Sequence, residues 1–234
     1  MNTKILSALT ATAAVTAMLG AAAPAHAFSF GTNGITFTQN QNVTFNFLES
    51  HGAYTSSLGI YEVQNSVASL VSTLFSETKS SDNGGSNEWR GTSGNTVASG
   101  PVTFQFLANK VYTLGLSSLY NGASAGTVYS SSSLNGGNQQ AVFGGSSLFG
   151  DLNLEATNKF GAAGSFANGV GSLFNKGFGT TISFDDRGNG NDADFQDFTV
   201  TAEAVPEPMT MTGLALGLGG LIAARRRRAS KTAS

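Results

Sequence analysis

Apolar and polar residues alternate in six short stretches of the chain, which is the pattern of strands that bury one face and expose the other. The stretches are 35–38, 43–47, 102–106, 111–116, 181–184 and 198–201. Clusters of Gly, Asn and Ser, such as 80–86 and 135–138, separate them and indicate turns. Many short strands with such turns predict an all-β fold, a single antiparallel β-sandwich of the jelly-roll type.

One stretch does not alternate, and its apolar residues recur at the three- and four-residue spacing of a helix: Val67, Leu70, Val71, Leu74 and Phe75. Ser66 precedes the stretch and is a suitable N-cap. Val, Ser and Thr are nevertheless mediocre helix formers. The sequence therefore predicts either a helix or a strand over 67–75.

The N-terminal segment 1–27 contains the three parts of a secretory signal peptide. Lys4 lies in a short polar start, residues 5–23 are apolar apart from Ser, Thr and Gly, and Ala25 and Ala27 form a small-x-small cleavage site. We expect residues 1–27 to pass through the Sec translocon and to be removed by signal peptidase. The mature chain then begins at Phe28.

The C-terminal segment 205–234 contains a second pattern of three parts: the motif Val205-Pro206-Glu207-Pro208, the apolar run 209–224, and the basic tail 225–234 with Arg225, Arg226, Arg227 and Arg228. Proline fixes φ and lacks an N–H, so the motif is predicted to be extended. The apolar run has no charge and is short for a membrane-spanning helix. Flanking arginines can snorkel, and they orient the tail towards the cytoplasm. A transmembrane helix is therefore predicted over 209–224.

This order of parts resembles the PEP-CTERM sorting signal of Gram-negative bacteria. The resemblance implies recognition by an exosortase, a membrane-embedded transpeptidase-like enzyme, and cleavage near the Pro-Glu-Pro motif. It also implies an association with exopolysaccharide and biofilm matrix. The expected route is an inner-membrane intermediate, held by residues 209–224, and then the cell surface or the extracellular matrix. A membrane anchor that is never cleaved is the alternative.

Between the two signals lies the segment 28–204, whose length suits one extracellular domain. It carries 13 acidic and 6 basic side chains, a net charge of -7, whereas the whole chain has -2 because its C-terminal tail is basic. Such an acidic domain is unsuited to nucleic acid, whose phosphates need Lys and Arg, and is better suited to cations. The chain has no cysteine, which excludes disulfides, cysteine-ligated metals and thiol catalysis.

Five aspartates fall within the short segment 185–197, between two of the predicted strands, and Arg187 is the one basic residue among them. Close carboxylates repel each other by about 1 kcal/mol per pair even in water. Calcium relieves this repulsion and takes six to eight oxygen ligands. The predicted calcium ligands are Asp186, Asp192, Asp194 and Asp197. A solvated acidic turn is the alternative.

Residues 182–200 are similar to the end of DUF4114-type domains, which read roughly Phe-Glu-Asp, a Gly-rich loop, Asp-x-Asp-aromatic-x-Asp and an apolar strand. Here Asp185 takes the place of the Glu and Phe195 that of the aromatic residue. Residues 47–63 resemble the opening of such domains, and the middle of the chain is not covered. The resemblance implies a β-rich extracellular domain suspected of binding calcium, and it implies no known reaction.

Residues suited to catalysis are sparse between the two signals. His51 is the one histidine of residues 28–204, and a Ser-His-Asp triad would need it together with a Ser and an Asp from elsewhere in the chain. We predict that His51 makes hydrogen bonds in a turn or the core. The alternative, an enzyme, would need His51 to meet an aspartate in a cleft. The sequence therefore predicts a non-enzymatic, calcium-binding surface or matrix protein. The alternative is a carbohydrate-binding module, in which Trp89, Tyr54 or Tyr120 would line one groove.

Overall fold

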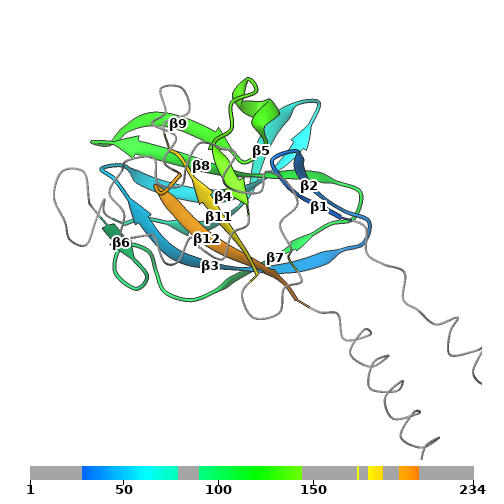
Figure 1. Ribbon diagram of the computed structural model, residues 1–234, viewed down its shortest axis with the longest axis horizontal. Coiled ribbons are helices and arrows are strands. Elements are labelled where there is room, and N and C mark those ends of the chain that lie inside the picture. The colour runs from blue at the N-terminus through cyan, green and yellow to red at the C-terminus, as the bar shows by residue number, and fades with distance from the viewer. Residues whose placement is uncertain (1–27, 79–89, 144–172, 174–178, 187–194, 206–234) are drawn as a thin grey trace, which may run out of the picture. The chain divides into compact units, whose positions relative to one another are not determined.

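The computed structural model describes residues 28–78, 90–143, 173, 179–186 and 195–205. All of them belong to one compact unit, Ala27–Val205. They form strands and one short 3-10 helix, η1 (Ser132–Asn135), which confirms the all-β prediction (Figure 1). No helix within these ranges has the length and apolar character to span a membrane. The predicted signal peptide 1–27 and the segment 206–234, which includes the predicted helix 209–224, lie outside the described residues.

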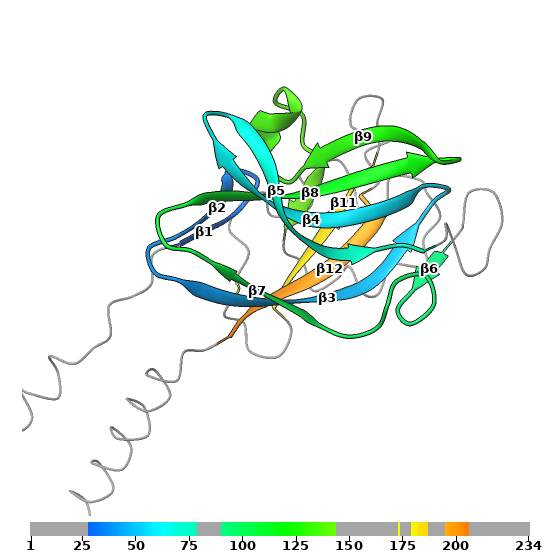
Figure 2. The same cartoon turned by 180° about the vertical axis from the view of Figure 1, so that it is seen from behind.

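The strands form two antiparallel six-stranded sheets, seen from opposite sides in Figures 1 and 2. Sheet A has the order β1-β2-β8-β4-β5, with β9 also paired to β8; its strands are β1 (Phe28–Gly31), β2 (Gly34–Phe37), β4 (Thr55–Gln64), β5 (Val67–Ser76), β8 (Val111–Tyr120) and β9 (Ala123–Tyr129). Sheet B has the order β10-β11-β12-β3-β6, with β7 also paired to β3; its strands are β3 (Gln41–His51), β6 (Arg90–Thr92), β7 (Val102–Phe106), β10 (Ala141–Phe143), β11 (Thr180–Phe184) and β12 (Phe198–Ala204).

The six alternating stretches all coincide with strands, as predicted, and Thr38 alone lies beyond the end of its strand. Strand β3 follows the expected pattern, with Val43, Phe45 and Phe47 buried and Asn42 and Asn46 exposed. Strands β11 and β12 differ from the prediction of one buried and one exposed face. Every residue of β11 is buried, and so are the first five of β12. Sheet B is therefore covered on both faces at these strands, and their polar side chains must find partners inside the protein.

Hydroxyl pairing satisfies some of these buried polar side chains. The hydroxyls of Ser183 and Thr199, which lie opposite each other on β11 and β12, are 3.0 Å apart. A Ser or Thr that has such a partner can occupy a buried face at little cost.

Residues 67–75 form a strand, β5, so the strand alternative is correct. The register between β4 and β5 shifts twice, and Val71 and Leu74 are the residues on β5 that have no partner on β4. Each bulge adds one residue and moves the next side chains to the other face of the strand. This is why Leu74 and Phe75 are both buried although they are consecutive. Val67, Leu70 and Val71 are exposed, so the helix-like spacing of the apolar residues does not mark one buried face.

The two sheets bury a shared core of aromatic and aliphatic side chains. Five ring contacts between the sheets have centroid distances of 5.1 to 6.1 Å: Phe30–Phe143, Phe37–Phe106, Phe47–Phe75, Phe104–Tyr112 and Phe106–Tyr112. Phe106 has two of these contacts and is fully buried. Aromatic pairs contribute about 0.5–1.5 kcal/mol beyond the burial of their area. The core therefore holds the sheets together in a chain without disulfides.

A carboxylate bridges the two sheets at the edge of this core. Glu77 follows β5 and is 9% exposed. It accepts a hydrogen bond from the Ser50 hydroxyl of sheet B and another from the Ser56 backbone N–H of sheet A, the latter at 2.6 Å. Burial raises the pKa of Glu77 to about 7, although both hydrogen bonds favour the charged form. Glu77 is therefore a buried acid that titrates near neutral pH.

We expect Glu77 to make the stability of the fold depend on pH. In the folded protein, the Glu77 carboxyl keeps its proton up to about pH 7. In the unfolded chain, the same carboxyl releases its proton near the ordinary pKa of 4.5. The free energy of unfolding should therefore fall as pH rises from about 4.5 to about 7, by up to about 3 kcal/mol, and then level off. Urea unfolding across this range, with a chelator present, measures the effect.

The Glu77→Gln variant is the matched control, because its amide can accept from the Ser56 N–H and donate to the Ser50 hydroxyl. It should lack this fall and should be more stable than the parent protein at about pH 8. If the free energy of unfolding falls with pH equally in the two proteins, Glu77 is not the source of the pH dependence.

Candidate metal centre

Three aspartates converge where β11 ends and β12 begins. The Asp197 N–H donates to the Phe184 carbonyl at 3.0 Å, and the Asp186 N–H donates to Asp197 Oδ2 at 2.8 Å. These bonds close the base of the loop between the two strands. As a result, one carboxylate oxygen from each of Asp185, Asp186 and Asp197 lies within 4.8 Å of the others.

The three carboxylates lie largely away from water. Asp185 is fully buried, Asp186 is 5% exposed and Asp197 is half-buried. Charges removed from water are costly unless they are paired, hydrogen-bonded or bound to a metal. Their mutual repulsion also grows as the surrounding dielectric constant falls. The three carboxylates are thus placed where they could hold a cation.

A buried glutamine, Gln140, lies opposite Asp185 in the strand register. Gln140 immediately precedes β10, and its carbonyl accepts the Asp185 N–H at 3.1 Å. This bond continues the register in which Ala141 lies opposite Phe184. Opposite residues of an antiparallel pair project from the same face, so the Gln140 and Asp185 side chains are neighbours.

The amide of Gln140 lacks the partners that a buried polar group needs. Gln140 is fully buried, and neither its Oε1 nor its Nε2 has a hydrogen-bond partner. Leaving a buried polar group unsatisfied costs about 1–3 kcal/mol. A cation held by the three carboxylates would give the Oε1 atom a partner. Gln140 is thus a second observation, independent of the acidic cluster, that favours a bound ion.

Strand β3 supports the cluster from the other side. The His51 N–H donates to the Asp197 carbonyl at 3.1 Å, and Gly52 follows with a φ of +92°. A Cβ at Gly52 would lie 3.3 Å from Asp197 Oδ1. A side chain at Gly52 would therefore be strained and would crowd the carboxylate. The glycine at this turn leaves space for the Asp197 carboxylate.

The His51 side chain belongs to a neighbouring group of charges. His51 Nε2 lies 3.3 Å from Glu49 Oε1, and Arg90 on β6 contacts the other oxygen of Glu49. Glu49 is 2% exposed. The sequence predicts that His51 makes hydrogen bonds in a turn or the core. In the structure, His51 is the last residue of β3, and its side chain has Glu49 as an acidic partner.

Of the four predicted calcium ligands, the structure brings Asp186 and Asp197 together. Asp192 and Asp194 lie outside the described residues. Sequence reasoning missed Asp185, although its place directly after a predicted strand, across the loop from Asp197, was a usable signal. It also missed Gln140, which joins the site through the pairing of β10 with β11.

The donors at this centre are all oxygen atoms. Carboxylate and amide oxygens suit hard cations such as calcium, magnesium and manganese. Calcium accepts irregular sets of six to eight oxygens, whereas magnesium requires a near-ideal octahedron. The oxygen donors here come from the two ends of one loop and from the residue before β10. Such an irregular set suits calcium better than magnesium.

Comparison with known proteins gives no match to a family model, a curated protein or a solved structure.

Proposed function

We propose that this chain is an exported, non-enzymatic surface or matrix protein whose β domain is stabilised by a calcium ion. The observation that carries the proposal is the convergence of Asp185, Asp186 and Asp197 beside the unpartnered amide of Gln140. Asp192 and Asp194, from the same loop, would add oxygens towards the six to eight that calcium takes.

An ion at this position would join parts of the chain that are far apart in the sequence. Gln140 precedes β10, Asp185 and Asp186 follow β11, and Asp197 precedes β12. A ligand that binds the folded state alone stabilises it, by about 2.7 kcal/mol at a hundred times its dissociation constant. In a chain without cysteine, calcium would stabilise a domain outside the cell where disulfides cannot.

The proposal includes the finer fold and the route of export. The chain alternates between the sheets, with β3 in B, β4 and β5 in A, β6 and β7 in B, and β8 and β9 in A. We assign this connectivity to the jelly-roll type. We also propose that residues 1–27 are removed on export, and that an exosortase acts near Pro206-Glu207-Pro208 while residues 209–224 hold the chain in the membrane.

The end of the compact unit supports the sorting part of the proposal. The unit ends at Val205, whose N–H donates to the Asn42 carbonyl at 2.9 Å and whose carbonyl accepts from Gln41 Nε2 at 3.1 Å. Val205 is 39% exposed. The proposed motif thus begins where the hydrogen-bonded β domain ends, which is where a processing enzyme needs its substrate.

Calorimetric titration of calcium into the protein, purified from the cells that produce it and stripped with a chelator, tests the site. We expect saturable binding at micromolar to millimolar calcium and a rise in melting temperature, both lost in Asp185→Asn combined with Asp197→Asn. Glu62→Gln removes a carboxylate elsewhere on the domain and should bind calcium as the parent does. No heat and no stabilisation at several millimolar calcium would leave the cluster as an acidic turn.

A Gln140→Met variant tests whether Gln140 is a calcium ligand, because methionine keeps the side-chain length and removes the amide. If Gln140 is a ligand, calcium affinity should fall about tenfold or more, which corresponds to about 1.4 kcal/mol. If it is not, affinity should stay and the calcium-free fold should gain stability, since a buried unsatisfied group has been removed.

Replacing Pro206, Glu207 and Pro208 with alanine tests the sorting route in the producing organism. The variant should keep its apolar run and basic tail, run at a higher mass and remain with the inner membrane. A Ser230→Ala change in the tail should leave mass and location as in the parent. The sorting proposal fails if the triple variant reaches the same place at the same mass as the parent.

One observation favours the carbohydrate-binding alternative. The rings of Tyr54, in the turn after β3, and Tyr120, at the end of β8, lie 5.2 Å apart at an interplanar angle of 40°. Tyr120 is 49% exposed. Exposed aromatic rings offer an apolar face and a polar edge, which suits a sugar ring. Trp89, the third aromatic residue considered, lies outside the described residues.

A pull-down with the exopolysaccharide of the producing strain tests this alternative. Retention should drop at least several-fold in Tyr54→Ala combined with Tyr120→Ala. It should stay in Tyr61→Ala, which removes one ring of the Tyr61–Tyr129 pair on another part of sheet A. A parent protein that is not retained, or a double variant retained as well as the parent, would count against glycan binding at this pair.

A further inference from the structure

Strand β5 is an unprotected edge. It is the last strand of sheet A in the part of the chain that the structure describes, so its outer backbone groups have no neighbouring strand. Natural edge strands are usually protected by charged residues or proline. Residues 67–76 contain neither, and Val67, Leu70 and Val71 are 63%, 55% and 45% exposed.

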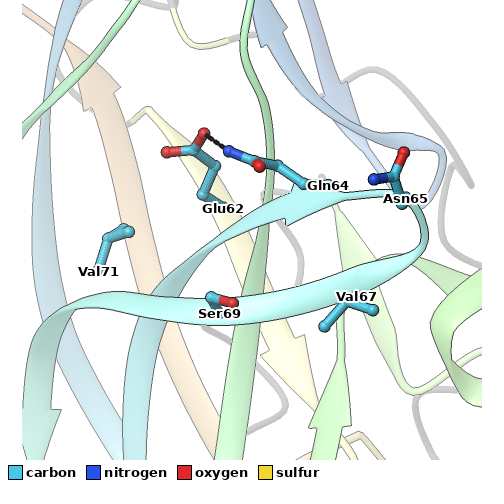
Figure 3. Close-up of a pocket in the computed structure, with 6 residues that line it drawn as sticks. All are labelled: Glu62, Gln64, Asn65, Val67, Ser69 and Val71. Carbon is cyan, nitrogen blue, oxygen red and sulfur yellow. Dashed lines mark hydrogen bonds between the residues drawn. The ribbon is translucent and has the colours of Figure 1, made fainter.

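The exposed part of β5 forms one wall of a groove of about 380 Å³ (Figure 3). Its lining combines polar residues of β4 and the turn with small side chains of β5: Glu62, Gln64, Asn65, Val67, Ser69 and Val71. Asn65 and Ser66 both have positive φ, of 52° and 63°, as in the two-residue type I′ turn of a tight hairpin. The turn fixes the register, so the groove has a defined surface.

We propose that a second copy of this chain pairs its β5 antiparallel with this strand, about a two-fold axis at Ser69, so that the two A sheets become continuous. In this register, Ser69 lies opposite its own copy. Val67 of each chain lies opposite Val71 of the other, and Ala68 lies opposite Leu70. Opposite residues share a face, so the exposed valines pair with each other within the two joined grooves.

Charge also favours a second copy over a charged partner. Glu62 lies opposite Ser69 within one chain, so the two Glu62 carboxylates would be three strand spacings apart, about 14 Å. That distance exceeds the Debye length of about 8 Å at physiological ionic strength. Each Glu62 is also paired with Lys110 at 2.8 Å. The strand itself is neutral, so the pairing brings no like charges together and offers none to hold a charged peptide.

The bulges in β5 limit this pairing to residues 67–71, which end at the first bulge residue, Val71. A ladder of about five residues a side is small beside the roughly 1,200 Å² that stable interfaces bury. We therefore expect a weak dimer, with a dissociation constant in the micromolar to millimolar range, which crowding of many copies at one surface would favour. This proposal does not depend on the calcium site, and its experiments are run both in calcium and in chelator.

Cysteine cross-linking tests the axis, because the natural chain has no cysteine. Opposite Cα atoms of antiparallel strands are about 4.5–5.5 Å apart, within the reach of a disulfide. Ser69→Cys, in the full protein purified from producing cells, should form a covalent dimer under mild oxidation with copper–phenanthroline. Ala125→Cys places an exposed thiol on β9 and should stay largely monomeric.

Sedimentation of the parent and of Ser69→Lys tests the association itself. Two lysines facing each other across the axis should raise the dissociation constant several-fold, because like charges directly opposite each other destabilise the pairing. Ala125→Lys adds the same charge on β9 and should leave it unchanged. A parent that stays monomeric up to about 1 mM, a Ser69→Lys dimer as tight as the parent's, or equal cross-linking of the two cysteine variants would overturn the proposal.

Discussion

The packing of two phenylalanine-rich sheet faces against each other is the interaction on which the rest of the structure depends. Phe106 illustrates it, since it belongs to sheet B and contacts Phe37 and Tyr112 of sheet A. The chain has no disulfide to assist. Every polar group near this core must therefore fit the position that the aromatic packing leaves for it, as Glu77 does by accepting hydrogen bonds from both sheets.

The candidate metal centre is a consequence of strand register. Residues Gln140, Asp185, Asp197 and His51 come from four places in the chain, and they follow one line across sheet B through consecutive backbone hydrogen bonds. A shift of one residue in any of these pairings would turn a side chain to the opposite face. The core fixes the register, and the register places Gln140 opposite Asp185.

Glu77 and the three aspartates are buried acidic groups that differ in how their charge is satisfied. Glu77 stands alone, accepts two hydrogen bonds and can take up a proton near pH 7. Asp185, Asp186 and Asp197 stand together, and each added negative charge raises the cost for the others. Single carboxylates inside proteins are often neutralised by protons, whereas crowded ones favour cations. The difference explains why the proposed ion belongs at the loop and not at Glu77.

The sequence by itself determined the β class and six of the twelve strands that the structure describes, because alternation such as that in β3 and β7 directly reflects one buried face. It also pointed to the loop 185–197, since five aspartates so close together along the chain are visible without a fold. Only the tertiary structure decided that β5 is a bulged strand, that β11 and β12 are buried on both faces, and that Gln140 joins Asp185. The physical reason is that bulges, two-sided burial and cross-strand neighbours depend on which strands pair, and local periodicity contains no information about partners.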